Sequence, residues 1–527
     1  MTSSTSSVLA PLALLFAAAC GGSAPLKTTV PSDTEVATSL EAIGREARRQ
    51  DNAGPTLQST GPRFVDRTAD YGLAGVEGVS FALVDLNRDL IPDLVLMPSY
   101  YSQPRVFLFD PRAKRFVEHR EPLFGEIVQA SFLVFADFNN DRVLDVVVGT
   151  LNQRGEYSKQ PLTLWQGRYD QGEVLRFEKA SGFPALPAAP TSAVVVLDAN
   201  LDGRLDLFVG NWFQEIKKNL LPHPDWLLLN RPKEWQLAGE FLRGEDLKTG
   251  NDLYPPAAKP TYGASSCDVD QDGWPDILTA SSAGHYNKLW MNRPSLTGER
   301  DFVDVGKESG YAADPNGLLV PTNGGRTFAA VCSDYNDDGL MDVFLGELTH
   351  GWDNLSADRS SVLTGAKIGH PPSFLRTEYM ADSVADNWNQ GDKRALWADL
   401  NNDGLVDILV DNSGFPPNSR LVAFAQDETR AFSNVAHQWG IDVVNPTGTV
   451  VADFNGDGKL DILTGQSNIR KESISNRLYL FENQLDLRDR RSFVFHLEGE
   501  RANHQGIGAT VMLYTEKTDG GTVRRVV

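Results

Sequence analysis

The nonapeptide DFNGDGKLD, from Asp453 to Asp461, decides the fold, because seven versions of it, this one included, recur along the chain. In chain order the others are DLNRDLIPD from Asp85, DFNNDRVLD from Asp137, DANLDGRLD from Asp198, DVDQDGWPD from Asp268, DYNDDGLMD from Asp334 and DLNNDGLVD from Asp399. Each copy joins two short hydrophobic segments, and neighbouring copies start 52 to 70 residues apart. A period of this length with strands in every unit is typical of a repeat architecture.

Positions 1, 3, 5 and 9 of every copy carry Asp or Asn. Alternate side chains of a curled loop point inward, so these oxygens converge on one point. A flexible, carboxylate-rich cage of oxygens suits Ca²⁺, and the absence of His and Cys from these positions argues against zinc or copper. The sequence therefore predicts up to seven calcium sites. Their expected ligands are Asp85, Asn87, Asp89, Asp93, Asp137, Asn139, Asp141, Asp145, Asp198, Asn200, Asp202, Asp206, Asp268, Asp270, Asp272, Asp276, Asp334, Asn336, Asp338, Asp342, Asp399, Asn401, Asp403, Asp407, Asp453, Asn455, Asp457 and Asp461.

A single copy would be equally compatible with a plain hairpin turn, because Asp and Asn are common turn formers. The same Asp at positions 1, 5 and 9 in all seven copies favours metal binding. We expect the calcium to be structural rather than catalytic. At an affinity typical of extracellular modules, millimolar calcium would stabilise each site by about 1.4 kcal/mol.

Position 6 requires a sharp turn, often in the left-handed region, which glycine adopts without steric cost. Five copies have glycine there, and the first two have Leu90 and Arg142. A non-glycine residue in this conformation costs about 1 kcal/mol. We therefore expect these two sites to bind calcium about fivefold more weakly.

Each unit contains four hydrophobic segments, and in the first unit they surround residues 81–84, 94–97, 106–109 and 116–117. Four antiparallel strands in each of seven repeats predict an all-β protein, a seven-bladed β-propeller over residues 62–487, which leaves no long exposed sheet edge. The last unit lacks a fourth strand, and a matching segment, Phe64 to Asp66, precedes the first unit. The N-terminal segment is therefore expected to complete the last blade and close the ring.

The chain has 527 residues and a formal net charge of -21. Seven bound divalent cations would offset two thirds of that charge, and no basic patch of the nucleic-acid-binding type is visible. Three cysteines are too few for a disulfide scaffold. Cys267 and Cys332 lie one and two residues before the fourth and fifth acidic loops and so have opposite strand parity; both a disulfide between neighbouring blades and two buried free thiols remain open.

The first twenty residues resemble an export signal. The apolar run from Val8 to Ala19 is too short to span a bilayer, and it ends in small residues before Cys20, as at a bacterial lipoprotein cleavage site. No Lys or Arg precedes the run, and Ala17 replaces the commoner Leu. We expect an exported protein, a bacterial outer-membrane or cell-surface lipoprotein attached through Cys20, or else a secreted one, with residues 21–61 as a polar tether.

The loops resemble the FG-GAP or VCBS repeats of integrin α-subunit propellers. The recurring segments FVDRTADYGL, FVDVGKESGY and AFSNVAHQWGI resemble relatives of cartilage acidic protein. The stretch from Ser492 to Thr515 is similar to the start of the ASPIC/UnbV module, matched at Asn503, Gly506, Gly508 and Ala509. The resemblance covers roughly residues 63–515 and implies a partial module over residues 490–527.

The acidic loops all join first and second strands, so they are expected on one face of the ring. The loops after the second strands then emerge on the opposite face, which is also the ligand face of integrin-like propellers. Aromatic rings among amides favour binding of protein or sugar, although such rings also pack between long loops. The candidate ligand residues are Tyr100, Tyr101, Trp212, His285, Tyr286, His350, Trp352 and Phe415.

Catalytic motifs are absent: no G-x-S-x-G elbow, phosphate-binding loop or zinc-binding helix occurs. Calcium would occupy nearly all paired carboxylates, and Asp353, Asp382 and Asp386 are the exceptions. We therefore expect a non-enzymatic, calcium-binding adhesion or binding module for an extracellular protein or glycan. The alternative is a secreted polysaccharide-active lyase or hydrolase, which a central cluster of free carboxylates, Arg and Tyr would favour.

Overall fold

The chain folds into many antiparallel sheets with only two short helices among the described residues, α2 (Gly306–Ser309) and α4 (Ala436–Trp439). The protein is therefore all-β, as expected. The computed structural model describes residues 64–526, apart from 152–159, 170–173, 214–221, 239–241, 244–257, 283, 297, 316–324, 351–357, 380–388, 414–418, 470, 486–491, 493–494, 496, 501, 512 and 517–522.

The first three sheets are antiparallel meanders in chain order. They consist of β2 (Ser80–Val84), β3 (Asp93–Met97), β4 (Arg105–Asp110) and β5 (Arg115–His119); β6 (Phe132–Ala136), β7 (Asp145–Gly149), β8 (Thr163–Arg168) and β9 (Arg176–Lys179); and β10 (Thr191–Leu197), β11 (Asp206–Asn211), β12 (Trp226–Asn230) and β13 (Trp235–Leu237). The fourth sheet has β15 (Thr261–Cys267), β16 (Asp276–Ser281), β17 (Leu289–Pro294) and β18 (Arg300–Asp304), with β14 (Leu242–Arg243) parallel to β18.

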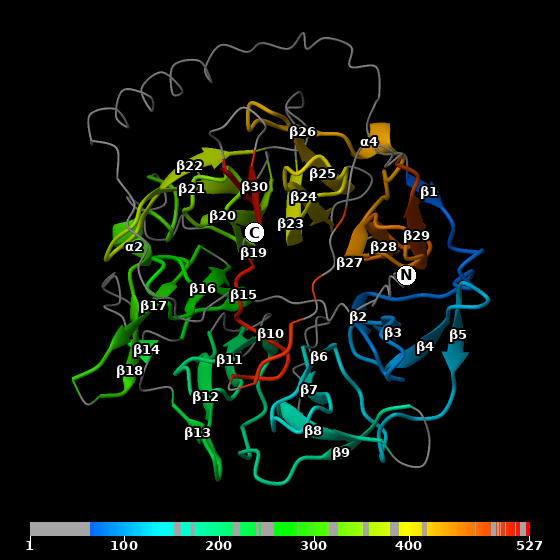
Figure 1. The fold of residues 1–527 in the computed structure, drawn as a ribbon, viewed down its shortest axis with the longest axis horizontal. Coiled ribbons are helices and arrows are strands. Elements are labelled where there is room, and N and C mark those ends of the chain that lie inside the picture. The colour runs from blue at the N-terminus through cyan, green and yellow to red at the C-terminus, as the bar shows by residue number, and fades with distance from the viewer. Residues whose placement is uncertain are drawn as a thin grey trace, which may run out of the picture.

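An eight-stranded sheet follows, because β20 pairs with both β19 and β23. It contains β19 (Thr327–Ser333), β20 (Asp342–His350), β21 (Ser361–Lys367), β22 (Ser373–Glu378), β23 (Asn389–Ala398), β24 (Asp407–Asn412), β25 (Leu421–Gln426) and β26 (Phe432–Asn434). The last large sheet has β27 (Pro446–Ala452), β28 (Asp461–Gln466), β29 (Arg477–Asn483) and β1 (Phe64–Asp66). These sheets stand around a common axis, which is a β-propeller-like layout (Figure 1).

The second strand of each meander is the most buried. All five residues of β3 and of β7 are buried, and so are all six of β11, β16 and β24. Continuous Val, Ile and Leu runs are expected where a strand has packing partners on both faces. The core accordingly lies between neighbouring sheets; one cluster joins Leu94 and Phe109 of the first sheet to Leu463 and Leu480 of the last.

The N-terminal strand closes the ring, as the sequence predicted. β1 pairs antiparallel with β29, with Phe64 opposite Asn483 and Asp66 opposite Phe481. The backbone continues the contact, because Arg67 donates its N–H to the carbonyl of Leu480 at 2.8 Å. The first described residues and the last large sheet therefore form one unit.

The third and fourth strands expected in the first unit, around residues 106–109 and 116–117, are present as β4 and β5. The pattern missed β21 and β22, which follow the long insertion after β20, and it missed the short strand β13. It also missed α2 and α4, which lie within the recurring segments FVDVGKESGY and AFSNVAHQWGI. Both helices end at a glycine in the left-handed conformation.

The structure joins Cys267 and Cys332 in a disulfide, which resolves the alternative that the sequence left open. The bond links β15 to β19, the innermost strands of two neighbouring sheets. Cys267 is fully buried. The two cysteines lie 65 residues apart in sequence, so the bond closes a loop about as long as one repeat.

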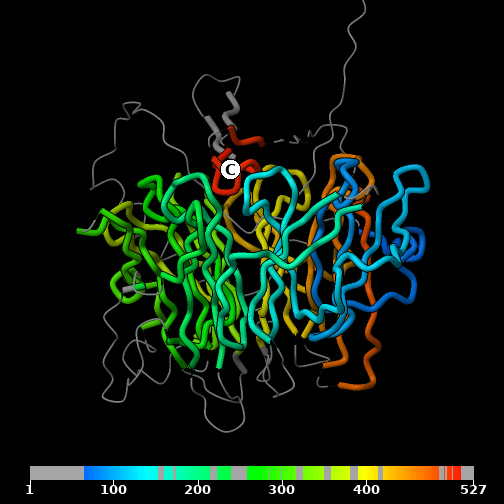
Figure 2. Tube along the Cα trace, turned by 90° about the horizontal axis from the view of Figure 1, so that it is seen from below, coloured from blue at the N-terminus to red at the C-terminus, as the bar shows by residue number. Residues whose placement is uncertain are grey.

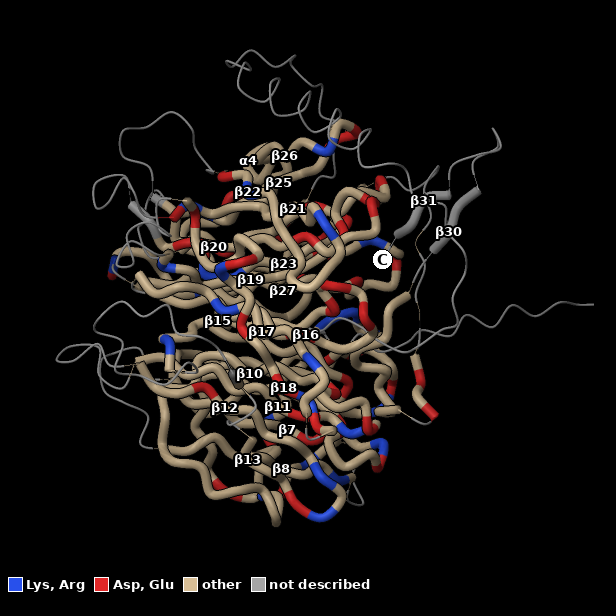
Figure 3. Tube along the Cα trace, turned by 90° about the vertical axis from the view of Figure 1, so that its left-hand side faces the viewer, with Lys and Arg blue, Asp and Glu red and all other residues tan. Residues whose placement is uncertain are grey.

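Residues 497–500 and 502–511 lie at one end of the axis (Figure 2). They are followed by β30 (Leu513–Glu516), which pairs antiparallel with β31 (Val523–Val526). Many acidic residues lie along the same side of the molecule (Figure 3). Asn503 is buried and bonds Ile507 twice, donating to its carbonyl at 2.7 Å and accepting its N–H at 2.8 Å. The segments expected to be the signal and tether, residues 1–61, lie outside the described residues.

Candidate metal centres

The seven nonapeptides, numbered loops 1 to 7 in chain order, each join the first two strands of a meander. The Asp at position 9 is the first residue of the second strand in every case, in β3, β7, β11, β16, β20, β24 and β28. The loops therefore all lie at the same end of their strands, as the sequence predicted.

Position 6 adopts a left-handed conformation in all seven loops, as expected. Its φ is 66° at Leu90 and 68° at Arg142, and it lies between 81° and 92° at the five glycines. Position 4 is left-handed as well, which the sequence analysis missed. The residues there are Arg88, Asn140, Leu201, Gln271, Asp337, Asn402 and Gly456. Asn or Asp occupies position 4 in three of the loops, and these residues tolerate the left-handed region better than most. Their presence could have indicated the conformation.

The carboxylate at position 1 organises the turn. One of its oxygens accepts the backbone N–H of position 5 and the other accepts that of position 6, at 2.8–3.3 Å in all loops. The Asp at position 5 in turn accepts the N–H of position 7, as at Asp89 and Ile91. The loop thus curls around the side chains of positions 1, 3 and 5.

The Asp at position 9 has a second role that the sequence did not reveal. It is fully buried in all seven loops. One oxygen accepts the N–H of position 2, and the other accepts an N–H of the third strand, at 2.7–3.2 Å. In loop 1 these donors are Leu86 and Phe109. Each position-9 carboxylate therefore connects the loop to the sheet.

Burial also sets the electrostatics of position 9. It raises the pKa of Asp93 and Asp145 to about 7 and that of Asp342 and Asp461 to about 8. It raises the pKa well above the usual range at Asp206, Asp276 and Asp407. A cation beside these carboxylates would favour their ionised form. The buried charge is the physical reason to expect a metal here.

The donor set of loop 4 fits calcium, because ligand oxygens of Asp268, Asp270 and Asp276 lie within 4.8 Å of one another. Loop 4 is also the one with Asp instead of Asn at position 3, and the guanidinium of Arg293 offsets the extra charge. Arg293 Nη1 lies 2.6 Å from Asp270 Oδ2, and His370 Nδ1 lies 2.7 Å from the same oxygen.

Side chains at position 4 connect neighbouring loops. Asn140 donates to the carbonyl of Gly203 at 2.8 Å, and Asn402 donates to that of Gly458 at 3.1 Å. Gln271 makes the same bond to Gly339. Loops 2 and 3, 4 and 5, and 6 and 7 are thereby linked in pairs. The left-handed backbone at position 4 directs the amide sideways, to the next sheet.

Replacing Leu90 by Gly should strengthen calcium binding at loop 1 about fivefold, because a left-handed non-glycine residue costs about 1 kcal/mol. Calorimetric titration of the wild-type and variant proteins measures the change. Leu90 is the better test position, since Arg142 also pairs with Glu498 at 2.5 Å.

The matched reverse substitution is Gly273→Ala in loop 4. Its φ is 92°, and an added Cβ would meet no atom within 4 Å, so only the backbone conformation changes. We expect the affinity of that loop to fall by a similar factor. If loop 1 binds calcium equally well with Leu or Gly at position 90, and loop 4 equally well with Gly or Ala at position 273, the residue at position 6 does not set the calcium affinity.

The candidate ligand residues lie in differing surroundings. Trp212 is half-buried, packs edge-on against Tyr262 with ring centroids 5.3 Å apart, and donates its indole N–H to Ser282 at 2.7 Å. Tyr286 is buried, whereas Tyr100 and Tyr101 are half-buried. His285 is half-buried near Tyr286 in sequence. Packing thus accounts for part of the set. The side chain of His350, and Trp352 and Phe415, lie outside the described residues, as do Asp353, Asp382 and Asp386.

A family model described as the FG-GAP-like repeat matches residues 85–148 and 399–464. These stretches contain loops 1 and 2 and loops 6 and 7, so the chain carries FG-GAP-like repeats. The comparison with curated proteins gives no match.

Several solved structures are similar at low sequence identity. One is an Agrocybe aegerita lectin described as recognising non-reducing terminal N-acetylglucosamine, with a TM-score of 0.40, 12% identity, and coverage of 78% of this chain and 95% of the lectin. Another is the V. cholerae biofilm matrix protein Bap1, with a TM-score of 0.38, 10% identity, and coverage of 87% and 96%. A putative 6-phosphogluconolactonase from Bacteroides uniformis has a TM-score of 0.36, 9% identity, and coverage of 70% and 95%. These likenesses carry no argument about function.

Proposed function

We propose that the protein is a calcium-stabilised, seven-bladed propeller of the cartilage acidic protein (ASPIC/UnbV) type that binds an extracellular protein or glycan. The observation that carries this proposal is the shared geometry of the seven loops, each with an inward-turned set of Asp and Asn oxygens. The eight-stranded sheet supplies two blades, β19–β22 and β23–β26, and each of the five other large sheets supplies one. Residues 62–487 would form the propeller and residues 490–527 a partial module.

Residues 1–20 would direct export, with Cys20 as the lipidated residue, and residues 21–61 would tether the propeller. This part of the proposal rests on the sequence alone. No helix among the described residues is long and apolar enough to cross a membrane. In this proposal, contact with the membrane would be through the lipid on Cys20.

The binding face would be the one opposite the acidic loops. Tyr101 and Trp212 both follow second strands, β3 and β11, so they lie at the ends of the strands remote from loops 1 and 3. Half-buried aromatic side chains with polar neighbours offer apolar area at low entropic cost. The acidic loops would bind calcium and stabilise the fold, and the opposite face would bind the ligand.

A screen of glycans and of bacterial and host surface proteins, in calcium and in EDTA, would identify the ligand. The double variant Tyr101→Ala with Trp212→Ala should lose at least tenfold in affinity, because it removes two rings from the proposed face. Trp274→Ala is the matched control, since Trp274 belongs to loop 4 on the other face. Thermal melts monitored by circular dichroism establish that the variants fold. Undiminished binding by a folded double variant would refute the assignment of the face.

The second candidate is a polysaccharide-active lyase or hydrolase. One observation favours it: Tyr100, Tyr262, Lys393, Arg394 and Asp411 line a small depression together. However, Asp411 is buried and accepts both the N–H and the hydroxyl of Thr449. Its carboxylate is therefore held for structure, and this depression lacks a second acid. Release of new reducing ends or of unsaturated sugars in the same glycan screen would favour the enzyme.

A further inference from the structure

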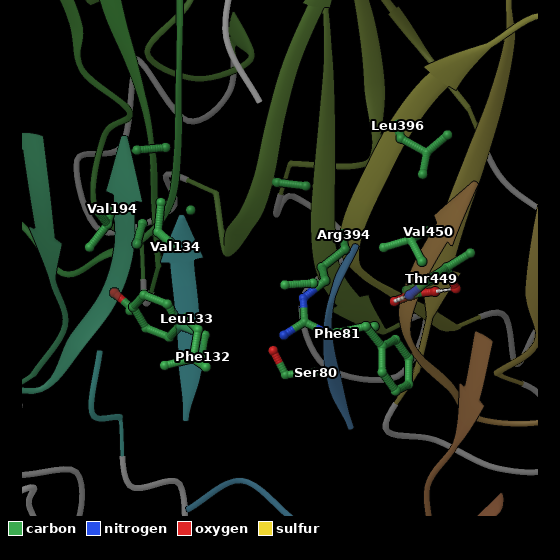
Figure 4. Close-up of a pocket in the computed structure, with 18 of the residues that line it drawn as sticks. Ser80, Phe81, Phe132, Leu133, Val134, Val194, Arg394, Leu396, Thr449 and Val450 are labelled. Carbon is green, nitrogen blue, oxygen red and sulfur yellow. Dashed lines mark hydrogen bonds between the residues drawn. The ribbon is translucent and has the colours of Figure 1, made fainter. Parts of the chain in front are cut away.

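A cavity of about 310 Å³ runs along the axis of the ring. The innermost strands β2, β6, β10, β15, β19, β23 and β27 all contribute to its wall. Most of the lining is apolar, with Val134, Val194 and Leu396 among the side chains shown (Figure 4). We call this space the axial cavity.

At the end nearest the acidic loops, Ile507 and Gln505 line the axial cavity. Gln505 accepts the N–H of Asp137 at 2.6 Å, and Ile507 packs with the cluster that contains Phe138. The C-terminal segment is therefore anchored on loop 2 and supplies an apolar floor.

Two cationic side chains, Lys393 and Arg394, line this space. The guanidinium of Arg394 lies near Ser80 (Figure 4), and its Nη1 donates to the carbonyl of Val79 at 3.3 Å. Arg394 forms no ion pair among the described residues. Asp411 lines the same cavity and is held by two hydrogen bonds from Thr449; burial raises the pKa of Asp411, and the charge of Arg394 opposes that shift. A guanidinium facing an apolar wall is stabilised by an anion that enters beside it.

The position of Arg394 departs from the repeat. In three other strand pairs the equivalent cross-strand residues are small: Ala193 opposite Gly210, Gly263 opposite Ala280, and Ala329 opposite Gly346. In β23 and β24 the pair is Arg394 and Asp411. The fold forms without charges at this register in the other three pairs, so the charged pair is particular to β23 and β24.

A β-bulge precedes each of these positions. The register shifts between Thr191 and Ala193, and likewise between Asp392 and Arg394. A bulge changes the direction of the following side chains. In β23 it places Lys393 and Arg394 together in the lining of the axial cavity. The bulge in β23 therefore determines where the two cationic side chains lie in the cavity.

The shape of the cavity bears on the size of a ligand. Arg394 precedes loop 6 by five residues, which corresponds to about 16 Å of extended strand. Arg394 and Ile507 both line the cavity, so an extended chain suits it better than a compact ligand. A sugar in this space would leave its hydroxyl groups without partners, whereas an alkyl chain needs none.

We propose that the axial cavity binds a long-chain carboxylate, with its anionic head at Arg394 and its alkyl tail directed toward Ile507. The surface-binding role proposed above does not require this site. Arg394 would provide two parallel N–H donors to the carboxylate. The tail would lie along Val134, Val194 and Leu396.

The test uses the intact chain with decanoate and 1-decanol as probes, at a calcium concentration too low to precipitate the carboxylate. Calorimetry measures the affinity for each probe, and the ¹³C chemical shift of carboxyl-labelled decanoate reports the surroundings of its carboxylate. Arg394→Gln should weaken the binding of decanoate at least tenfold and change the affinity for decanol less than twofold, since only the charge is removed. Val194→Phe fills the cavity and should weaken both.

Arg112→Gln is the matched control, because Arg112 is exposed on the β4–β5 turn. It should change neither affinity. Circular dichroism melts verify that each variant folds. Decanoate that fails to bind the wild-type protein, or binds Arg394→Gln equally well, overturns the proposal. Either result leaves the calcium loops and the surface site untouched.

Discussion

A chain that begins at residue 73 should be far less stable than one that begins at residue 62. The eleven residues removed include β1, the strand that completes the last sheet. Phe64 and Tyr71, both nearly fully buried, would be lost with it, and each such truncation typically costs about 3–5 kcal/mol. A total near 6 kcal/mol or more is comparable with the whole stability of many domains.

Urea unfolding followed by tryptophan fluorescence measures the difference between the two chains. A milder variant, Thr68→Val, removes the hydroxyl that accepts the N–H of Leu480 at 2.9 Å. It should cost about 1 kcal/mol. If the chain that begins at residue 73 unfolds at the same urea concentration as the chain that begins at residue 62, the pairing of β1 with β29 does not close the ring in solution.

Removal of calcium should destabilise the protein by an amount on the order of 10 kcal/mol. Five sites at about 1.4 kcal/mol each, with smaller contributions from the weaker sites of loops 1 and 2, supply a sum of that order when calcium exceeds the dissociation constant of the five sites tenfold. Without a cation, the buried position-9 carboxylates would lose the charge that favours their ionised form. Dialysis against EDTA followed by a thermal melt measures the loss.

Two controls separate a specific effect from a general one. Magnesium at the same concentration should restore less stability, because it demands stricter octahedral geometry. Asp202→Asn in loop 3 retains an oxygen that can accept the N–H of Arg204, now 3.0 Å away, but removes one ligand charge. It should reduce the calcium-dependent increment and leave the melt in EDTA unchanged. A melting temperature insensitive to EDTA would exclude calcium as the stabilising ion.

The period of the loops predicted the all-β class and the pairing of β1 with β29, because both follow from local patterns that repeat. The double role of Asp93 and its equivalents was not predictable in the same way. Its partner Phe109 belongs to the third strand, and that contact depends on the register between strands joined by a variable loop.

The disulfide illustrates a similar limit. Strand parity indicated that Cys267 and Cys332 could face each other, but parity does not give a distance. That distance is set by how β15 packs beside β19. Likewise, β21 and β22 follow an insertion whose length gives no signal of where the next strand begins. The sequence did not single out Arg394, because its unusual place becomes apparent only when equivalent positions of the strand pairs are compared from the bulge onward.

Tyr71 and Glu482, which share a hydrogen bond, are separated by 411 residues. During synthesis β1 is therefore made first and waits for its partner until nearly the whole ring has left the ribosome. Contacts this remote in sequence slow folding far more than they reduce stability, because the entropy of closing a loop grows only with the logarithm of its length. The early sheets can form while the chain is still growing, but the circle is completed only at the end of translation. A ribosome that stalls before Arg477 would leave a partly built ring with two open edges.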